Sequence, residues 1–216
     1  MNIILFGPPG AGKGTQADNI VKNFSLHKIS AGDLLRKEIE KKSDLGLKIK
    51  SKIDHGMLVS DDIITDLIDN IISKKKSTEG VIFDGYPRNL NQAKILDTLI
   101  KKHNRKISCV LSLDVDKKNL KKRILGRIIC TKCGMIFNKY FNPPNEKNHD
   151  CGLDHLKVRS DDAEKTINNR IEIYTNQTLP ILDYYEGQKI LHKIDATGEI
   201  DKIYDEIRGI ITSLET

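Results

Sequence analysis

A glycine-rich segment near the start of the chain has the composition of a phosphate-binding loop. It has the sequence Gly-Pro-Pro-Gly-Ala-Gly-Lys-Gly-Thr over residues 7–15 and directly follows an apolar run at residues 3–6. Glycines let successive backbone N–H groups turn toward one point and form an anion-binding nest. A helix that begins there adds its partial positive charge, Lys13 adds a cation and Thr15 a hydroxyl. This order of strand, loop, lysine and helix predicts that the chain binds a nucleotide's phosphates.

Several arginines further along the chain suggest what happens to those phosphates. A terminal phosphate carries roughly −1.5 to −2 charge, and the planar fork of arginine matches its oxygens in a bidentate way. A single arginine is more often a surface residue. A set of them beside a phosphate loop favours phosphoryl transfer, which depends on positioning and charge stabilisation. The arginines concerned are singled out by the family resemblance described below, and they are Arg36, Arg88, Arg123, Arg127, Arg159 and Arg170.

Three of the 4 cysteines fall in one short stretch with metal-ligand spacing. Cys130 and Cys133 form a Cys-x-x-Cys pair, and Cys151 is followed three residues later by Asp154. Three thiolates and one carboxylate can complete a tetrahedral Zn²⁺ site, so we expect these four residues to hold structural zinc. The alternative is a stretch of free thiols without metal. The identity of the fourth ligand stays open among Asp154, His149, Asp150 and His155.

The elements that must position these residues alternate along the chain, which predicts an α/β fold with a mainly parallel sheet covered on both faces. We expect strands at residues 3–6, 28–30, 81–83, 109–113 and 190–194. Helices are expected at 13–24, 33–42, 61–73, 90–102, 116–125 and 199–214, and a long one from 161 towards 185, kinked at Pro180. Ser60, with Asp61 and Asp62 in the first turn, and Asn89 are the expected N-caps of two of them.

Length and composition limit the remaining possibilities. The 216 residues suffice for one sizeable α/β domain. Two stretches, residues 30–59 and 127–160, interrupt the alternation of strands and helices and look like insertions. The apolar runs are too short to cross a membrane, and the N-terminus lacks a signal-peptide pattern, so a cytoplasmic location is expected. The net charge is +6. Aromatic residues make up only 5% and there is no Trp, so stacking sites for nucleic acid are sparse.

In their order and spacing these fragments resemble the adenylate kinases along essentially the whole chain. In the loop, Gly14 separates Lys13 from Thr15, and this order of residues is typical of nucleoside monophosphate kinases. The other segments that carry the resemblance are 30–36, 56–59, 84–88 with Gln92, 123–127, 141–144, 159–162 and Arg170. The resemblance implies a P-loop nucleoside monophosphate kinase fold with a five-stranded parallel sheet flanked by helices.

The resemblance also implies a division into a core and two mobile subdomains. The core comprises residues 1–29, 60–126 and 161–216. Residues 30–59 form a monophosphate-binding segment, which we call the flap. Residues 127–160 form a segment over the triphosphate, which we call the lid; it resembles the long, zinc-binding lid of some bacterial members. Such proteins are usually monomers, and no nucleic acid or membrane partner is implied.

The resemblance assigns roles to individual residues, with Mg²⁺ accompanying ATP. Those placed at the transferring phosphates are Lys13, Arg88, Arg123, Arg127, Arg159 and Arg170, with Asp84 near Mg²⁺. Those placed at ATP are Gly10, Ala11, Gly12, Lys13, Gly14, Thr15, Arg123, Arg127, Ile136, Phe137 and Gly198. Those placed at AMP are Ala31, Arg36, Met57, Leu58, Val59, Gly85, Tyr86, Pro87, Arg88, Gln92, Arg159 and Arg170.

The expected activity is reversible transfer of the ATP terminal phosphate to AMP, giving two ADP. A UMP/CMP kinase is the nearest alternative, because Ala31 stands where adenylate kinases often have Thr. Gln92 and the long lid favour AMP. A P-loop NTPase switch and a zinc-ribbon module that binds nucleic acid are less favoured alternatives. For the switch, residues 84–88 look like an acceptor site rather than a segment that positions water.

Overall fold

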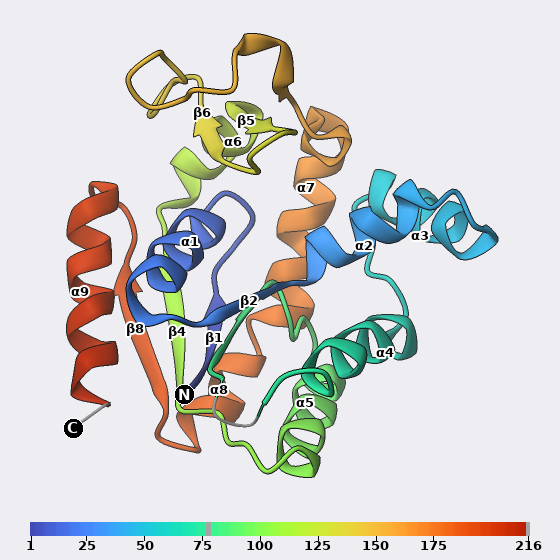
Figure 1. Cartoon of the computed structure of the whole chain (residues 1–216), viewed down its shortest axis with the longest axis vertical. Coiled ribbons are helices and arrows are strands. Elements are labelled where there is room, and N and C mark those ends of the chain that lie inside the picture. Colours follow the sequence, from blue (N-terminus) through green and yellow to red (C-terminus); the bar gives the residue numbers. More distant parts are fainter. Residues whose placement is uncertain (77–78, 215–216) are drawn as a thin grey trace.

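The fold is centred on a parallel sheet of five strands in the order β2-β3-β1-β4-β8 (Figure 1). It was obtained as a computed structural model that describes residues 1–76 and 79–214. The strands of this sheet are β1 (Asn2–Phe6), β2 (His27–Ser30), β3 (Val81–Asp84), β4 (Cys109–Asp114) and β8 (Leu191–Asp195). All neighbouring pairs run parallel. The five strands predicted from the sequence are therefore confirmed, each to within a residue or two at its ends.

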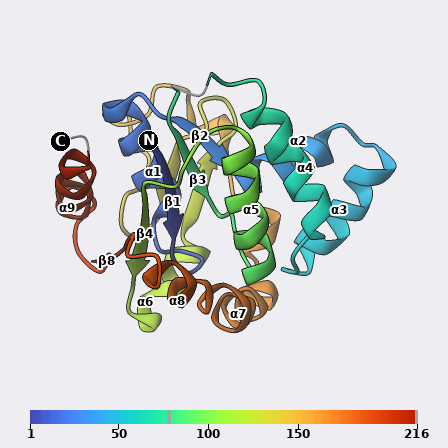
Figure 2. The same cartoon turned by 90° about the horizontal axis from the view of Figure 1, so that it is seen from below.

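Helices cover both faces of this sheet. The described residues form the α-helices α1 (Lys13–Phe24), α2 (Ala31–Glu40), α3 (Asp44–Asp54), α4 (Asp61–Ile72), α5 (Leu90–Lys102), α6 (Lys117–Leu125), α7 (Glu164–Ile173), α8 (Ile181–Glu186) and α9 (Ile200–Ser213), of which α2 and α3 belong to the flap. Side chains alternate across the pleat of a strand, so Ile3 of β1 packs with α1 and α9, whereas Ile4 packs with α4, α5 and α8. Figure 2 shows α9 and α5 on opposite sides of the strands. Both faces of β1 are thus buried, which holds the loop that follows it in place.

The two insertions have their own architectures. The flap consists of the paired helices α2 and α3, which project to one side of the sheet (Figure 1). The lid contains a small antiparallel sheet in the order β6-β5-β7. The strands of this small sheet are β5 (Arg127–Cys130), β6 (Ile136–Asn138) and β7 (Leu156–Lys157). The lid lies beyond the carboxyl ends of the core strands. Both insertions therefore lie near the edge of the sheet at which the phosphate loop begins.

The prediction of a single helix from residue 161 towards 185 is wrong in detail. A 3₁₀ helix (Ser160–Asp162) precedes α7, and a π-helical turn (Tyr174–Thr178) separates α7 from α8. Pro180 has no N–H to continue the α-helical ladder, and the N–H of Leu179 instead bonds the carbonyl of Tyr174, five residues back, at 2.8 Å. The disruption expected at Pro180 therefore extends upstream as a widened turn.

The two predicted helix caps have different outcomes. Asn89 is the N-cap of α5, and its side chain accepts from the N–H of Gln92 at 2.7 Å. Ser60 occupies the N-cap position of α4, but its side chain makes no capping hydrogen bond. Among the described residues, no helix is long and apolar enough to cross a membrane.

A buried arginine ties the segment after α4 to the edge of the core. Arg105 is only 7% exposed. Its guanidinium donates to the carbonyls of Glu79 at 2.6 Å, Lys76 at 2.5 Å and Lys75 at 3.3 Å. The five N–H donors of the planar fork can reach several acceptors that lie apart from one another, whereas an ammonium group has three donors on a single atom.

We predict that Arg105→Ala lowers the free energy of unfolding by about 1–3 kcal/mol, because partly buried carbonyls lose their donors. Urea unfolding measures the effect. Arg208→Ala, at an exposed residue of α9 whose ion pair with Asp205 is solvated, is the matched control and should change the stability by less than about 0.5 kcal/mol. Equal midpoints for the two variants would contradict a structural role for Arg105.

Candidate active site

The loop between β1 and α1 adopts a conformation that requires glycine. Gly10 and Gly12 have φ angles of 84° and 92°, in the left-handed region that side chains disfavour. A Cβ at Gly10 would also lie 2.9 Å from Cγ1 of Ile124. Because Gly12 is the N-cap of α1, the backbone of the loop and the positive end of the helix meet at one place.

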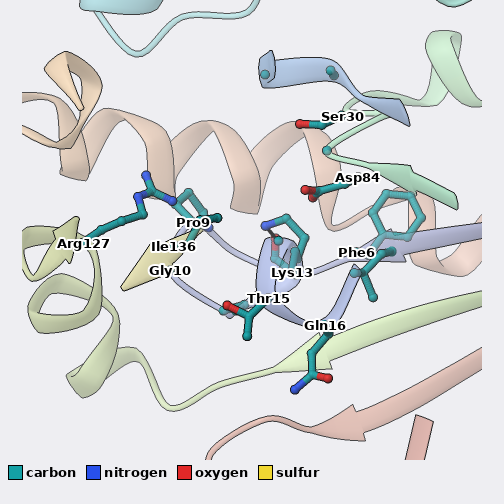
Figure 3. A pocket seen from close by; sticks show the side chains of 18 of the residues that line it. Phe6, Pro9, Gly10, Lys13, Thr15, Gln16, Ser30, Asp84, Arg127 and Ile136 are labelled. Carbon is teal, nitrogen blue, oxygen red and sulfur yellow. Dashed lines mark hydrogen bonds between the residues drawn. The ribbon is translucent and has the colours of Figure 1, made fainter. Parts of the chain in front are cut away.

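Lys13 lies over this loop (Figure 3). Its Nζ donates to the carbonyls of Gly7 at 2.6 Å and Pro8 at 3.0 Å. Burial, together with the charges of Arg88, Arg170 and Arg127, lowers the pKa of Lys13 to about 7, although Asp84 opposes the shift. Figure 3 shows the Asp84 carboxylate extending toward Lys13 from the end of β3. The loop thus holds a strongly desolvated amine whose charged form an anionic ligand would stabilise.

The loop opens onto a cavity of about 1120 Å³ that reaches both insertions. On the flap side it is lined by α2 and the segment before α4, and on the lid side by β6. Every residue that the sequence placed at a nucleotide lines this one cavity, from Gly10 and Ala31 to Gln92, Arg170 and Gly198. Ser30 and Asp161 also line it, although the sequence did not place them at a nucleotide.

Two acidic residues hold the arginines at the base of the lid. The side chain of Asp162 is fully buried. Its carboxylate accepts from Nε of Arg127 at 2.6 Å, from Nη2 of the same arginine, and from Arg170 at 2.8 Å. Asp161 adds an ion pair to Arg170 at 3.1 Å. From the sequence these aspartates are equally well interpreted as a plain helix N-cap; their proximity in sequence to Arg159 is the only signal of an ionic role.

In other arginines of the cavity the positive charge is less fully compensated by acidic groups. Burial, together with Arg127 and Arg36, lowers the pKa of Arg159 to about 10, although Asp161 and Asp33 oppose the shift. Its buried Nε has no hydrogen-bond partner among the described residues. Burial, together with Arg170, also lowers the pKa of Arg88, which is held by a bond from its Nε to the carbonyl of Gly85 at 2.8 Å. The cavity therefore concentrates positive charge that favours a highly anionic ligand.

The comparisons with known proteins agree with this geometry. A family model described as adenylate kinase matches residues 5–190. An adenylate kinase of Pelagibacter ubique is 44% identical over 98% of this chain and 99% of its own length. That of Methanosarcina barkeri is 42% identical over 98% of each chain, and that of Chloroherpeton thalassium is 44% identical over 99% of each. The chain belongs to the adenylate kinase family. This family membership gives no support to the UMP/CMP kinase alternative.

The lid of this adenylate kinase contains a cluster of metal-binding side chains. Ligand atoms of Cys130, Cys133, His149 and Cys151 all lie within 4.8 Å of one another. The backbone N–H groups of Lys132 and Cys133 point at the sulfur of Cys130, at 3.4 and 3.5 Å. Nε2 of His149 is buried and has no hydrogen-bond partner among the described residues. Three thiols and one imidazole match the donor set of structural Zn²⁺, so the residues present fit this ion.

The fourth member of the cluster differs from the one favoured by the sequence. Asp154 was expected from the symmetry of Cys151-x-x-Asp154 with the Cys-x-x-Cys pair. In the structure the chain turns at Gly152, with φ of 82°, into a 3₁₀ helix (Leu153–His155) on which Asp154 is exposed. His149 instead packs edge-on against Phe137, with ring centroids 5.0 Å apart, and completes the cluster.

We predict that His149→Asn loses zinc whereas Asp154→Asn keeps it. Structural zinc contributes its binding free energy to folding. Zinc removal or Cys130→Ser should therefore lower the melting temperature clearly, while the activity at moderate temperature changes little. Zinc content by atomic absorption and melting with and without chelator are the measurements. Zinc retained in His149→Asn but lost from Asp154→Asn would return the fourth position to the aspartate.

We predict that Mg-ATP binding takes up close to one proton between pH 7.5 and 9. Free Lys13, with its pKa at about 7, is largely neutral there, whereas a bound phosphate would raise that pKa again. Affinity should therefore fall as pH rises above 7 and level off below it. Calorimetry in buffers of different ionisation enthalpy counts the protons. Lys13→Arg, which stays charged throughout this range, should show no uptake; uptake equal to wild type would assign the proton elsewhere.

Proposed function

We propose that the cavity between loop, flap and lid is where this adenylate kinase carries out its reaction, the reversible, Mg²⁺-dependent transfer of the ATP terminal phosphate to AMP, which gives two ADP. The observation that carries the proposal is the gathering of Lys13 and six arginines around one cavity. Two nucleotides that meet at their phosphates bring more negative charge than one, and a surplus of buried cations stabilises that charge.

ATP would occupy the side of the cavity next to the phosphate loop and the lid. The loop residues from Gly10 to Thr15 would surround its phosphates through backbone N–H groups. Arg123, whose guanidinium bonds the carbonyl of Ala196 at 3.1 Å, would lie against the nucleotide. The adenine would contact Ile136 and Phe137 of β6 and the backbone at Gly198, all of which line the cavity.

AMP would occupy the side next to the flap. Arg36 and Arg88 would bind its phosphate, with Gly85, Tyr86 and Pro87 shaping the wall on which it lies. Ala31 and the segment Met57, Leu58 and Val59 would enclose the base, and Gln92 would hydrogen-bond it. Arg159 and Arg170 would then lie between the two nucleotides, at the phosphates in transfer.

The chain contributes positioning and charge rather than a general base. The attacking group is an ionised phosphate oxygen of AMP, so no proton has to be removed. Lys13 and the arginines would hold donor and acceptor in line and stabilise the charge that spreads over the transferring group. The Asp84 carboxylate and the Thr15 hydroxyl are oxygen donors of the kind that Mg²⁺ prefers, directly or through waters; this ion would neutralise phosphate charge.

The two insertions would close over the substrates. The lid would carry Arg127 and Arg159 onto the phosphates and exclude water, and zinc would hold its small sheet together. We further propose that the protein acts as a monomer in the cytoplasm, without nucleic acid or membrane partners. In support of this, all assigned nucleotide residues line a cavity of one chain, so no second subunit is needed to complete the site.

We predict that the protein forms ADP from Mg-ATP and AMP with a kcat/KM well above those for CMP and UMP. Arg88→Ala should lower kcat/KM by about 10²–10³-fold, the usual cost of one donor to transition-state charge. Arg208→Ala, on the exposed face of α9, is the control and should keep wild-type kinetics. A coupled assay for ADP gives both results.

Two outcomes would overturn this assignment. The absence of ADP with AMP present, combined with steady ATP hydrolysis in its absence, would favour an NTPase switch. A preference for CMP or UMP would move the protein to the UMP/CMP kinases.

A further inference from the structure

One carboxylate gathers three side-chain amides beside the flap end of the cavity. Asp61 is the first residue of α4, and its partners lie at the start of α5. Its Oδ1 accepts from Nε2 of Gln92 at 2.7 Å and from Nδ2 of Asn89 at 3.0 Å. Its Oδ2 accepts from Nδ2 of Asn91 at 2.7 Å. The start of α4 is thereby joined to the residue that we place at the base of AMP.

The opposite end of the Gln92 amide is fixed as well. Its Oε1 accepts from the backbone N–H of Arg88 at 2.7 Å. A backbone N–H can only donate and a carboxylate can only accept. If the amide turned over, its NH₂ would oppose the Arg88 N–H and its oxygen would oppose the Asp61 carboxylate. The orientation of Gln92 therefore follows from its two partners and would be costly to reverse.

The fixed amide still has hydrogen bonds to offer. A side-chain amide has two N–H donors and two lone pairs on its oxygen, and Asp61 and Arg88 use one of each. Gln92 is only 2% exposed and lines the cavity. One donor and one acceptor, in a fixed order, thus remain for a ligand.

That order distinguishes classes of purine. Adenine presents a donor at its 6-amino group and an acceptor at N1, whereas hypoxanthine and guanine present an acceptor at O6 and a donor at N1. An amide free to turn over could pair with either class, but an amide held in one orientation pairs well with one class only. A site that leaves a buried polar group unpaired discriminates strongly against the wrong ligand.

We propose that Asp61 is a positioning residue that sets base specificity at the monophosphate site, because it holds the Gln92 amide in the orientation that accepts adenine and rejects 6-oxopurines. The inference rests on the proposed function, in which Gln92 meets the base of AMP. The three amide hydrogen bonds from Asn91, Gln92 and Asn89 hold the pKa of Asp61 below its usual value, although desolvation opposes them. The carboxylate therefore stays an acceptor at neutral pH.

The test compares kcat/KM for AMP and for IMP, at saturating Mg-ATP, in three variants. Asp61→Ala should lower the AMP-to-IMP ratio at least about tenfold, since one bidentate base contact supplies discrimination of this size or more. Asp61→Asn keeps an acceptor oxygen and should keep the ratio. Asp62→Ala, at the exposed neighbour in the same helical turn, controls for lost charge at the N-terminus of α4 and should also keep it.

A readout other than activity follows the amide itself. In ¹⁵N-labelled protein without nucleotide, the Gln92 side-chain N–H signals should exchange slowly with solvent in wild type and in Asp62→Ala, and faster in Asp61→Ala. If Asp61→Ala does not fold, Asp61→Ser carries the same expectations, because serine suits a helix N-terminus but is too short to reach Gln92.

The outcomes separate this inference from the proposed function. A wild-type protein that does not phosphorylate AMP would overturn the proposed function itself. A wild-type protein active with AMP, together with an unchanged AMP-to-IMP ratio in folded Asp61→Ala, would overturn only the role of Asp61. A ratio unchanged in Gln92→Ala would overturn it too, because Gln92 would then not meet the base.

Discussion

Repulsion between buried cations is the constraint on which the rest of the site depends. The cavity must attract very negative ligands, yet it must also persist as a folded structure without them. Asp162 makes this possible, because its fully buried carboxylate lies between Arg127 and Arg170.

Arg127 is the first residue of the lid, and Asp162 lies just after the lid's last residue. One ionic cluster thus joins the two points at which the chain enters and leaves the lid, and connects both to α7. Removing one partner of such a buried pair leaves an uncompensated charge, which is usually costly.

Much of this arrangement could be predicted from local sequence. Buried parallel strands consist of short apolar runs, and the glycine loop places Lys13 and the start of α1 without reference to anything distant. Other features could not be predicted, because they depend on contacts between distant residues. The sequence does not distinguish Asp162 as an N-cap from Asp162 as a partner of Arg127, 35 positions earlier. It favoured Asp154 over His149 by the symmetry of spacing, whereas in the structure His149 lies with the three thiols and Asp154 is exposed. Likewise, the effect of Pro180 on the preceding turn depends on how α7 and α8 pack.

The flap and the lid are stabilised by different means. The flap shares the larger hydrophobic cluster of the core through Leu35 and Ile49 of its helices and through Val59 after them. The lid buries Phe137 and Cys130, but Met135, Leu153 and Val158 are exposed. A sheet of three short strands with so small a core is marginal on its own. A metal cluster adds stability at one point without adding apolar contacts to the rest of the molecule. The lid can then be internally rigid while it contacts the core through the ion pair of Arg127 with Asp162 and through Asn138, whose side chain donates to the carbonyl of Arg123.

Phosphate binding and base recognition would depend on different interactions, the first on Coulomb attraction and the second on the direction of hydrogen bonds. In the proposed assignment the phosphates would meet long cationic side chains from the loop, core, flap and lid, and Coulomb attraction would tolerate small displacements of each. Base recognition, as proposed here, would depend on the direction of one amide, which tolerates little displacement. Gln92 lies on α5 of the core, where Asp61 and the backbone of Arg88 fix both of its ends. A preorganised group loses little entropy when the ligand binds. Because the groups that fix this direction are on the core, the flap and lid could move without turning the Gln92 amide.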